Sequence, residues 1–323
     1  MLPFRCFFRT SSEESAVHSP RTLVYAALSY CVMMWALNTV LVKHLLGDVA
    51  PLAFTGIRFL MMTPLVVLLA VLRRERLFMH VRDLPLLIAC AACGYGVYQY
   101  FWIVGLSYTT AFATALLSSL TPIFTFAIVA VARIERVRSG RWLGALVALV
   151  GVAIFEGAFS GHASFRLGDA LALGAAAIFA FYNVLSARLL DRYTPVALVA
   201  ITMCIGTVMI LPGAIPQMLH QNYAHLSLFD WLIFGYSVLF PIVLTFPVWS
   251  WGISRLGAAR ASIFQFAVPV LAGLLSLPLL HARIANYQIA GAIACIGGMA
   301  FSQALGRVSL TALWSERTLP LKR

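Results

Sequence analysis

Long apolar stretches separated by short polar segments run through this sequence of 323 residues. Each stretch is about 20 residues long, which is the length that a helix needs to cross the hydrocarbon core of a bilayer. The polar segments between them are too short to hold a soluble domain. The pattern therefore predicts an all-α integral membrane protein with ten transmembrane helices, near residues 22–42, 52–72, 84–104, 111–131, 142–160, 168–187, 195–215, 231–253, 261–280 and 286–305.

One part of the chain occurs twice. Residues 105–155, shifted by 147 positions, align without a gap with residues 252–302. The two copies begin GLSYTTAFATALLSSLTP and GISRLGAARASIFQFAVP, so that Pro122 falls on Pro269. An internal repeat of about 150 residues in an apolar chain is typical of membrane transporters built from two halves.

The front of each half aligns as well, with Pro51 on Pro195. Each half then has five predicted helices, and an odd number inserts the second half upside down relative to the first. The sequence thus predicts two inverted five-helix repeats, with a site between them. The expected parts of the chain are a cytoplasmic N-terminal tail at 1–21, the first repeat at 22–160, the second repeat at 168–305 and a basic cytoplasmic C-terminal tail at 306–323.

Composition and charge agree with a membrane location. The chain is 62% hydrophobic and 11% charged, whereas soluble domains carry about 25% charged residues. Its net charge is +12, but the cationic residues lie in short clusters between apolar stretches, which does not favour a nucleic-acid partner. Nineteen Lys and Arg residues fall on one side of the predicted membrane and three on the other. This bias predicts a multi-pass protein of the cell (inner) membrane with both termini in the cytoplasm.

Five pieces of the chain carry a family resemblance. They read WALNTVLVKHLLGDVAPLAFTGIRF, GLSYTTAFATALLSSLTPIF, RIERVRSGRWLGALVALVGVAIF, GDALALGAAAIFAFYNVLSARLL and RLGAARASIFQFAVPVLAGLL. Their order resembles the EamA branch of the drug/metabolite transporter superfamily, over about residues 22–305. The resemblance implies a ten-helix carrier that moves small metabolites by alternating access and often exports amino acids. The family usually has a Glu after the ninth helix, as Glu135 follows the fourth, but Ala282 stands there in this chain.

Two prolines within predicted spans mark a first candidate site. A proline leaves the carbonyl group four residues earlier without its helical donor. Before Pro122 and Pro269 these residues are Ser118 and Gln265, which are equivalent in the repeat. Each half thus offers a freed carbonyl and a polar side chain at one depth, which predicts a substrate site shared by both halves. The alternative is a packing kink whose Ser and Gln bond to a neighbouring helix.

Aromatic and polar side chains share one face of several other predicted helices, with the spacing i, i+3, i+4, i+7 or part of it. The first, third, sixth and eighth predicted helices carry Trp35 and Asn38; Tyr95, Tyr98, Gln99 and Trp102; Tyr182, Asn183 and Ser186; and Trp249. Together they predict a cavity with aromatic walls and with amide and hydroxyl groups. Such a cavity suits a small amphipathic solute, such as a neutral amino acid.

Structural explanations exist for several of these residues. Trp102 and Trp249 are placed like the aromatic belt at a membrane interface. Asn38 and Asn183 are alternatively helix–helix hydrogen-bonding residues, an interaction worth about 0.5–1.5 kcal/mol. Arg58 lies toward the outer end of the second predicted helix, where its long side chain is expected to extend to the interface.

Charges at membrane depth are few. Glu156 lies near the outer end of the fifth predicted helix, close to Arg166 and Asp169 in the next connection. This placement favours an ion pair at the outer mouth over a proton site. Without a fixed charge in the cavity, the sequence favours a zwitterionic solute over a phosphate or a dicarboxylate.

Three classes of protein fit a polytopic chain, and a secondary carrier fits best. A membrane-embedded enzyme needs clustered carboxylates or His for acid–base or metal chemistry, but the 7 His are dispersed and no predicted span has paired Asp or Glu. A receptor or scaffold does not require an inverted duplication. We therefore expect a transporter that is not an enzyme, has no cofactor and no metal site, and has lipid and a small solute as its partners.

Overall fold

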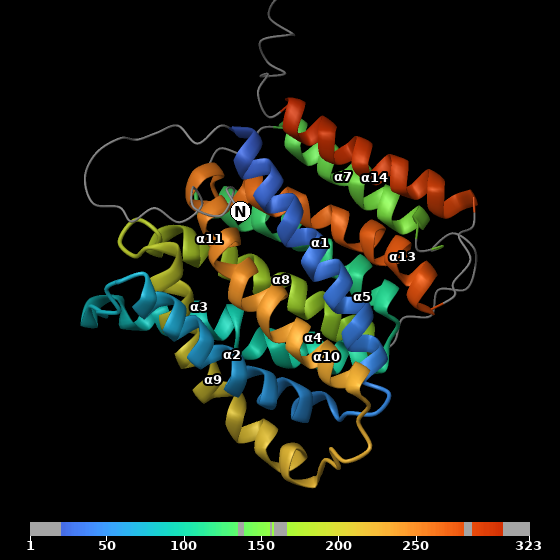
Figure 1. The fold of residues 1–323 in the computed structure, drawn as a ribbon. Helices are drawn as coiled ribbons and strands as arrows, with labels where there is room; N and C mark the ends of the chain where they lie inside the picture. Colours follow the sequence, from blue (N-terminus) through green and yellow to red (C-terminus); the bar gives the residue numbers. More distant parts are fainter. Residues whose placement is uncertain (1–20, 135–138, 156, 158–166, 281–285, 306–323) are drawn as a thin grey trace, which may run out of the picture.

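The computed structural model describes residues 21–134, 139–155, 157, 167–280 and 286–305. These residues form a bundle of helices and contain no strand (Figure 1). Eight stretches of the described helices are long and apolar enough to cross a membrane, and two shorter apolar helices lie in the other two predicted windows. The count of ten membrane-crossing helices stays a prediction. The two tails lie outside the described residues, as do Glu156, Arg166 and Ala282.

Six of the predicted spans are single helices in the structure. They are α1 (Arg21–Leu45), α2 (Pro51–Leu72), α7 (Ser139–Phe155), α8 (Leu167–Leu189), α9 (Pro195–His220) and α14 (Asn286–Leu305). Proline occupies the first position of α2 and of α9, where its missing N–H group has no helical acceptor to lose. Thr194 caps α9 by accepting a hydrogen bond from the backbone N–H of Ala197.

The other four predicted spans are broken. The third is α3 (Leu84–Gly94) and α4 (Val97–Tyr108), preceded by the short helix η2 (Val81–Asp83), and the fourth is α5 (Ala111–Ser118) and α6 (Thr121–Val131). The eighth is α10 (Leu228–Val238), the π-helical segment η3 (Leu239–Leu244) and α11 (Thr245–Leu256). The ninth is α12 (Ala258–Ser262), the 3₁₀ turn η4 (Ile263–Phe266) and α13 (Ala267–Leu280).

Glycine and proline account for the breaks. Gly94 and Gly96 flank the break between α3 and α4, and Pro241 lies in the π-helical segment. Pro122 is the second residue of α6 and Pro269 is the third residue of α13, so each lies in the first turn after the break in its span. Gly94 and Pro122 precede Pro241 and Pro269 by 147 positions each, so the two pairs of breaks fall at equivalent places of the sequence repeat.

α7 and α14 lie side by side at one edge of the bundle (Figure 1). Their backbones touch: a Cβ atom built at Gly151 would lie 2.4 Å from the backbone N of Cys295, and one at Gly298 would lie 2.4 Å from that of Ala148. Small residues allow such close packing of helices in lipid, where van der Waals contact replaces the hydrophobic effect.

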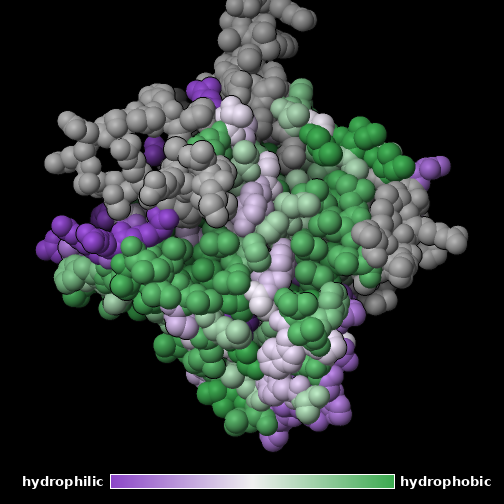
Figure 2. Space-filling view, in the orientation of Figure 1, coloured by the Kyte–Doolittle hydropathy of each residue, from purple (hydrophilic) through white to green (hydrophobic). Residues whose placement is uncertain are grey.

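The outer surface of the bundle is apolar. Leu68, Val71, Val208 and Leu232 are all more than half exposed, as expected for side chains in contact with lipid. Figure 2 shows apolar residues over most of one face, with hydrophilic residues gathered over the segment that joins α2 and α3. The structure is therefore that of a multi-pass membrane protein.

Candidate functional site

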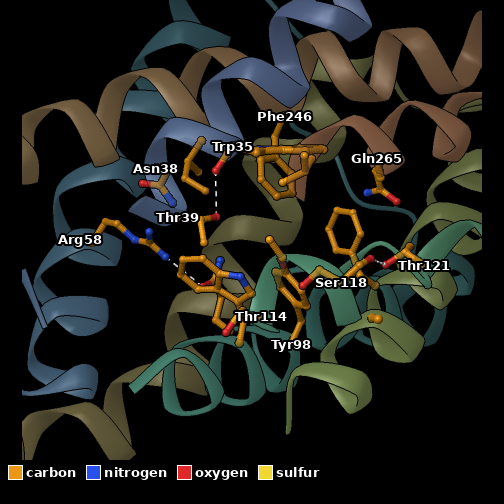
Figure 3. A pocket seen from close by; sticks show the side chains of 17 residues that line it. Trp35, Asn38, Thr39, Arg58, Tyr98, Thr114, Ser118, Thr121, Phe246 and Gln265 are labelled. Carbon is orange, nitrogen blue, oxygen red and sulfur yellow. Dashed lines mark hydrogen bonds between the residues drawn. The ribbon is translucent and has the colours of Figure 1, made fainter. Parts of the chain in front are cut away.

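A cavity opens inside the bundle where the broken helices meet α1, α2 and α8 (Figure 3). We call it the central cavity and define it by its lining residues. They are Trp35, Asn38 and Thr39 of α1; Arg58 of α2; Tyr98, Gln99 and Trp102 of α4; Thr114, Ala115 and Ser118 of α5; Thr121 of α6; Ala176 and Phe179 of α8; Ile242 and Phe246 of η3 and α11; and Gln265 and Val268 of η4 and α13.

The size of the central cavity limits what it can hold. Its volume is about 70 Å³, several times the roughly 10–15 Å³ that a single buried water needs. This volume fits a small metabolite and is too small for a lipid.

Aromatic rings form the middle of the cavity wall. The ring centroids of Tyr98 and Phe179 lie 4.8 Å apart, and Trp35 meets Phe179 and Phe246 edge-on at 6.0 and 5.8 Å. The indole N–H of Trp35 donates to the carbonyl oxygen of Pro241 at 2.9 Å. The π-helical segment thus holds the Trp35 ring in place, and the rings offer an apolar surface that has little freedom to move.

One end of the central cavity is cationic. The Arg58 side chain is 1% exposed. Its Nη2 donates to Gln99 Oε1 at 2.9 Å, and its guanidinium carbon lies 4.9 Å from the ring centroid of Phe54 and 5.9 Å from that of Trp102. The expected extension of Arg58 to the membrane interface is wrong, because its guanidinium points inward and is held among α2 and α4 side chains. Asn38 lies at the same end (Figure 3), and its Oδ1 has no hydrogen-bond partner among the described residues.

Hydroxyl and amide groups gather at the opposite end (Figure 3). The Thr121 hydroxyl donates to the carbonyl oxygen of Ser118 at 2.7 Å. The expected free carbonyl at Ser118 is therefore wrong, since a side chain replaces the donor that Pro122 removes. Gln265 is 6% exposed, and its Oε1 has no partner within the described part of the chain. This end of the cavity thus offers a buried acceptor that is free to bind a solute.

Comparison with known proteins identifies the family. A sequence model of the EamA-like transporter family matches residues 22–156 and 166–303. The chain belongs to the EamA-like transporter family. It is therefore a membrane transporter of small molecules, which agrees with the resemblance carried by its sequence motifs.

Individual relatives of this EamA-like transporter share a quarter or so of its residues. An uncharacterized transporter of Archaeoglobus fulgidus is 25% identical over 83% of this chain and 94% of its own length. A probable terminal-alkyne amino-acid exporter of Streptantibioticus cattleyicolor is 29% identical over 75% and 76%. A probable amino-acid metabolite efflux pump of Salmonella typhimurium is 23% identical over 87% and 95%. A solved crystal structure that is 20% identical covers 88% of this chain and 98% of its own, with a TM-score of 0.71, and so shares the fold.

The site residues predicted for this EamA-like transporter fall into two groups. Those that line the central cavity are Trp35, Asn38, Tyr98, Gln99, Trp102, Ser118 and Gln265. They come from both predicted repeats. Trp102 is 7% exposed, so its assignment to an interfacial belt is wrong. The role of this group in binding stays a prediction.

The second group, Tyr95, Tyr182, Asn183, Ser186 and Trp249, lies outside the lining of the central cavity. All five are 0% exposed, so Trp249 is not a belt residue either. Trp249 Nε1 donates to Asn183 Oδ1 at 3.1 Å, which is the helix–helix hydrogen bond considered as the alternative for Asn183. The hydroxyls of Tyr95 and Tyr182 lie 3.3 Å apart, and that of Ser186 donates to the carbonyl of Asn183 in its own helix.

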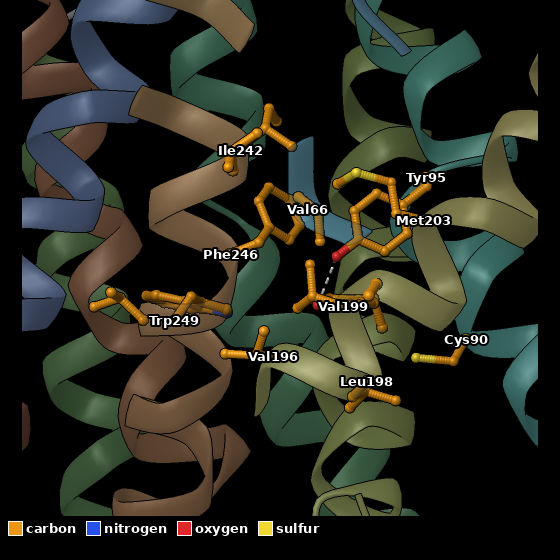
Figure 4. Close-up of a cluster of buried hydrophobic side chains, with 14 of the residues drawn as sticks. Val66, Cys90, Tyr95, Val196, Leu198, Val199, Met203, Ile242, Phe246 and Trp249 are labelled. Carbon is orange, nitrogen blue, oxygen red and sulfur yellow. Dashed lines mark hydrogen bonds between the residues drawn. The ribbon is translucent and has the colours of Figure 1, made fainter. Parts of the chain in front are cut away.

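The break between α3 and α4 explains why Tyr95 leaves the predicted face. One continuous helix would align Tyr95 with Tyr98 and Gln99, but the chain turns at Tyr95 and Gly96. The Tyr95 ring packs instead into the largest apolar cluster, where its centroid lies 5.1 Å from the ring centroid of Phe246 (Figure 4). The assignment of Tyr95 to the same face is therefore wrong.

Sequence reasoning missed several cavity residues, among them Thr114 and Thr121. Both share a helical face with the predicted residue Ser118, at the spacing i, i+4, i+7, and this periodicity could have identified them. Arg58 was the stronger signal, because an ionisable residue within a span is by default a functional candidate.

At the expected outer mouth, Asp169 accepts from the Thr109 hydroxyl at 2.6 Å, while Lys43 donates to the carbonyl of Thr109 at 2.7 Å.

Proposed function

We propose that this protein is a secondary carrier that exports neutral amino acids or closely related metabolites by alternating access. The observation that carries the proposal is the central cavity, which is small, walled by aromatic rings and polar at both ends. Two relatives support an amino-acid substrate through their names, a probable terminal-alkyne amino-acid exporter and a probable amino-acid metabolite efflux pump.

The proposed architecture is ten transmembrane helices in two inverted five-helix repeats. The protein lies in the inner membrane of the cell, with both termini in the cytoplasm. The family model supports two repeats, since it matches once in each half. The helix breaks support them too, because those in the third and fourth spans recur 147 positions later in the eighth and ninth. The cavity takes its lining from both proposed repeats, as expected for a site between them.

The packing around the central cavity supports alternating access. Phe246 lines the cavity and also belongs to the largest apolar cluster, which extends to Leu189, the last residue of α8, and to Tyr193 just beyond that helix. Trp102 lines the cavity and belongs to a second cluster, which contains Leu45 and Leu106 at the other end of the bundle. In the proposed cycle one cluster opens while the other stays packed, so that the solute reaches one side of the membrane at a time.

Uptake into proteoliposomes tests the proposal. Purified protein should move radiolabelled L-leucine with saturable kinetics, and unlabelled neutral amino acids should compete. Sugar phosphates should not compete, because they carry two negative charges and the described lining has a single cation. Liposomes without protein are the control. Leucine flux equal to that control, together with no flux of other neutral amino acids, would contradict an amino-acid carrier.

A further inference from the structure

Arg58 is a buried cation whose hydrogen-bonding capacity is largely unused. Two of its three guanidinium nitrogens, Nε and Nη1, have no acceptor among the described residues. Nη2 has only the neutral acceptor Gln99 Oε1, at 2.9 Å. A buried charge without an anionic partner is unfavourable, because one hydrogen bond to an amide does not offset the free energy lost when the charge leaves water.

The described part of the chain supplies no anion at this place. Within the described lining of the central cavity there is no Asp or Glu, and Arg58 is its one charged residue. An ion pair in the described part of the chain joins Arg192 and Asp83, in the segments that follow α8 and α2, away from Arg58. The rings of Phe54 and Trp102 lie near the guanidinium and stabilise its charge by cation–π attraction without occupying its N–H groups.

We propose that Arg58 binds the carboxylate of the transported solute, an inference that rests on the proposed carrier function and assigns its substrate class. The planar guanidinium forms two parallel hydrogen bonds with a carboxylate or a phosphate, and of the two the carboxylate has the single negative charge that one arginine neutralises. Gln99 fixes the orientation of the guanidinium and so acts as a positioning residue. One arginine neutralises one carboxylate, so the solute carries a single carboxylate at this end.

The opposite end of the cavity fits the other end of the same solute. Figure 3 shows Arg58 and Gln265 on opposite sides of the aromatic rings. An α-amino acid carries both charged groups on one carbon, so a solute held by its carboxylate at Arg58 has its amino group at the same end, where Asn38 Oδ1 has no partner among the described residues. Its side chain then extends along the rings of Trp35 and Phe246 toward Gln265, whose unpartnered Oε1 accepts a hydrogen bond. Arg58 in the lining also corrects the expectation of a cavity without fixed charge.

Competition against radiolabelled L-leucine, measured on purified protein in nanodiscs, tests this assignment. Leucinamide lacks the carboxylate and 4-methylpentanoate lacks the amino group. Leucinamide should compete at least tenfold more weakly than leucine. 4-Methylpentanoate, which keeps the carboxylate, should bind more tightly than isopentylamine, which keeps the amino group and lacks the carboxylate. Arg58→Gln should weaken leucine at least tenfold but change leucinamide less than threefold, and Arg58→Lys should keep part of the leucine affinity.

A matched control separates binding from folding. Arg188→Gln makes the same chemical change at an exposed position at the end of α8 and should leave leucine binding unchanged. Because the Arg58 charge is unpaired, Arg58→Gln should unfold at the same temperature as the native protein or higher, yet lose the stabilisation that leucine gives. If this variant does not fold, the ligand series on the native protein decides.

The outcomes distinguish this inference from the carrier proposal. Equal competition by leucine and leucinamide would overturn the role of Arg58 while leaving amino-acid transport intact. Binding of 4-methylpentanoate that depends on Arg58, without binding of any amino acid, would support the carboxylate site and overturn the amino-acid proposal. Failure of every carboxylate to bind would overturn the inference.

Discussion

Gln265→Leu is the substitution that most sharply separates a binding role from a packing role in the central cavity. The side chain is 6% exposed, and its Oε1 has no partner among the described residues. Leucine has a similar volume and no polar atoms. The change therefore removes the side-chain amide of Gln265, whose Oε1 makes no hydrogen bond within the fold but lines the cavity in which the solute is proposed to bind.

The structure gives the expected magnitudes. A buried unsatisfied polar group costs about 1–3 kcal/mol, so its removal should leave the melting temperature unchanged or raise it. A hydrogen bond between neutral groups, such as one from the side-chain amide of a glutamine solute to Gln265 Oε1, is worth about 0.5–1.5 kcal/mol. Its loss should weaken glutamine binding about 2- to 12-fold and change leucine binding less, at about 1.4 kcal/mol for each factor of ten.

The assay is uptake of glutamine and of leucine into proteoliposomes, together with thermal unfolding of the same preparations. Gln217→Leu is the matched control. Gln217 Oε1 accepts from the backbone N–H of Leu52 at 2.9 Å, away from the cavity, so this variant should lose stability and keep its affinity for glutamine. Unchanged glutamine kinetics in Gln265→Leu, or a lowered melting temperature, would refute the assignment of Gln265 to the binding site.

Three further predictions concern other parts of the molecule. Tyr98→Ala removes a ring that lies 4.8 Å from that of Phe179, so competition assays should show a larger loss for phenylalanine than for alanine; equal losses would make Tyr98 a packing residue. Gly298→Ala places a Cβ atom 2.4 Å from the backbone N of Ala148, and such overpacking should destabilise the protein by about 1–3 kcal/mol. Gly297→Ala, where the added Cβ meets nothing within 4 Å, should not destabilise the protein, and thermal unfolding of both variants measures the difference. Single cysteines near residues 48 and 222 should react with an impermeant reagent from outside the cell and one near residue 77 only from inside; the reverse pattern would contradict the proposed topology.

Hydropathy predicted the helices well and their continuity poorly. Window length fixes where a chain can cross lipid, and the long helices α1, α2, α8 and α9 match their predicted windows. The same windows do not show that a helix axis bends. Pro122 and Pro269 marked two of the breaks, whereas the break at Gly94 and Gly96 was hidden within an apolar stretch.

The candidate site was predicted in part, for the same reason. Tyr98 and Gln99 of the unbroken helix α4 line the cavity together, as their spacing predicted. Tyr95 lies across a break and was misplaced. Periodicity also cannot tell a cavity from a tight interface, because both present aromatic and polar residues at helical spacing; Asn183 and Trp249 pair with each other instead of lining the cavity.

Protection of Ser118→Cys by solute tests most directly whether the central cavity is the transport site. Ser118 lines the cavity, so the introduced thiol should react with a small methanethiosulfonate reagent, and peptide mass spectrometry distinguishes it from the native cysteines. Saturating leucine should slow this modification, with half-protection at the leucine concentration that half-saturates uptake. Modification at the same rate with and without leucine, in a variant that still transports leucine, would contradict the account.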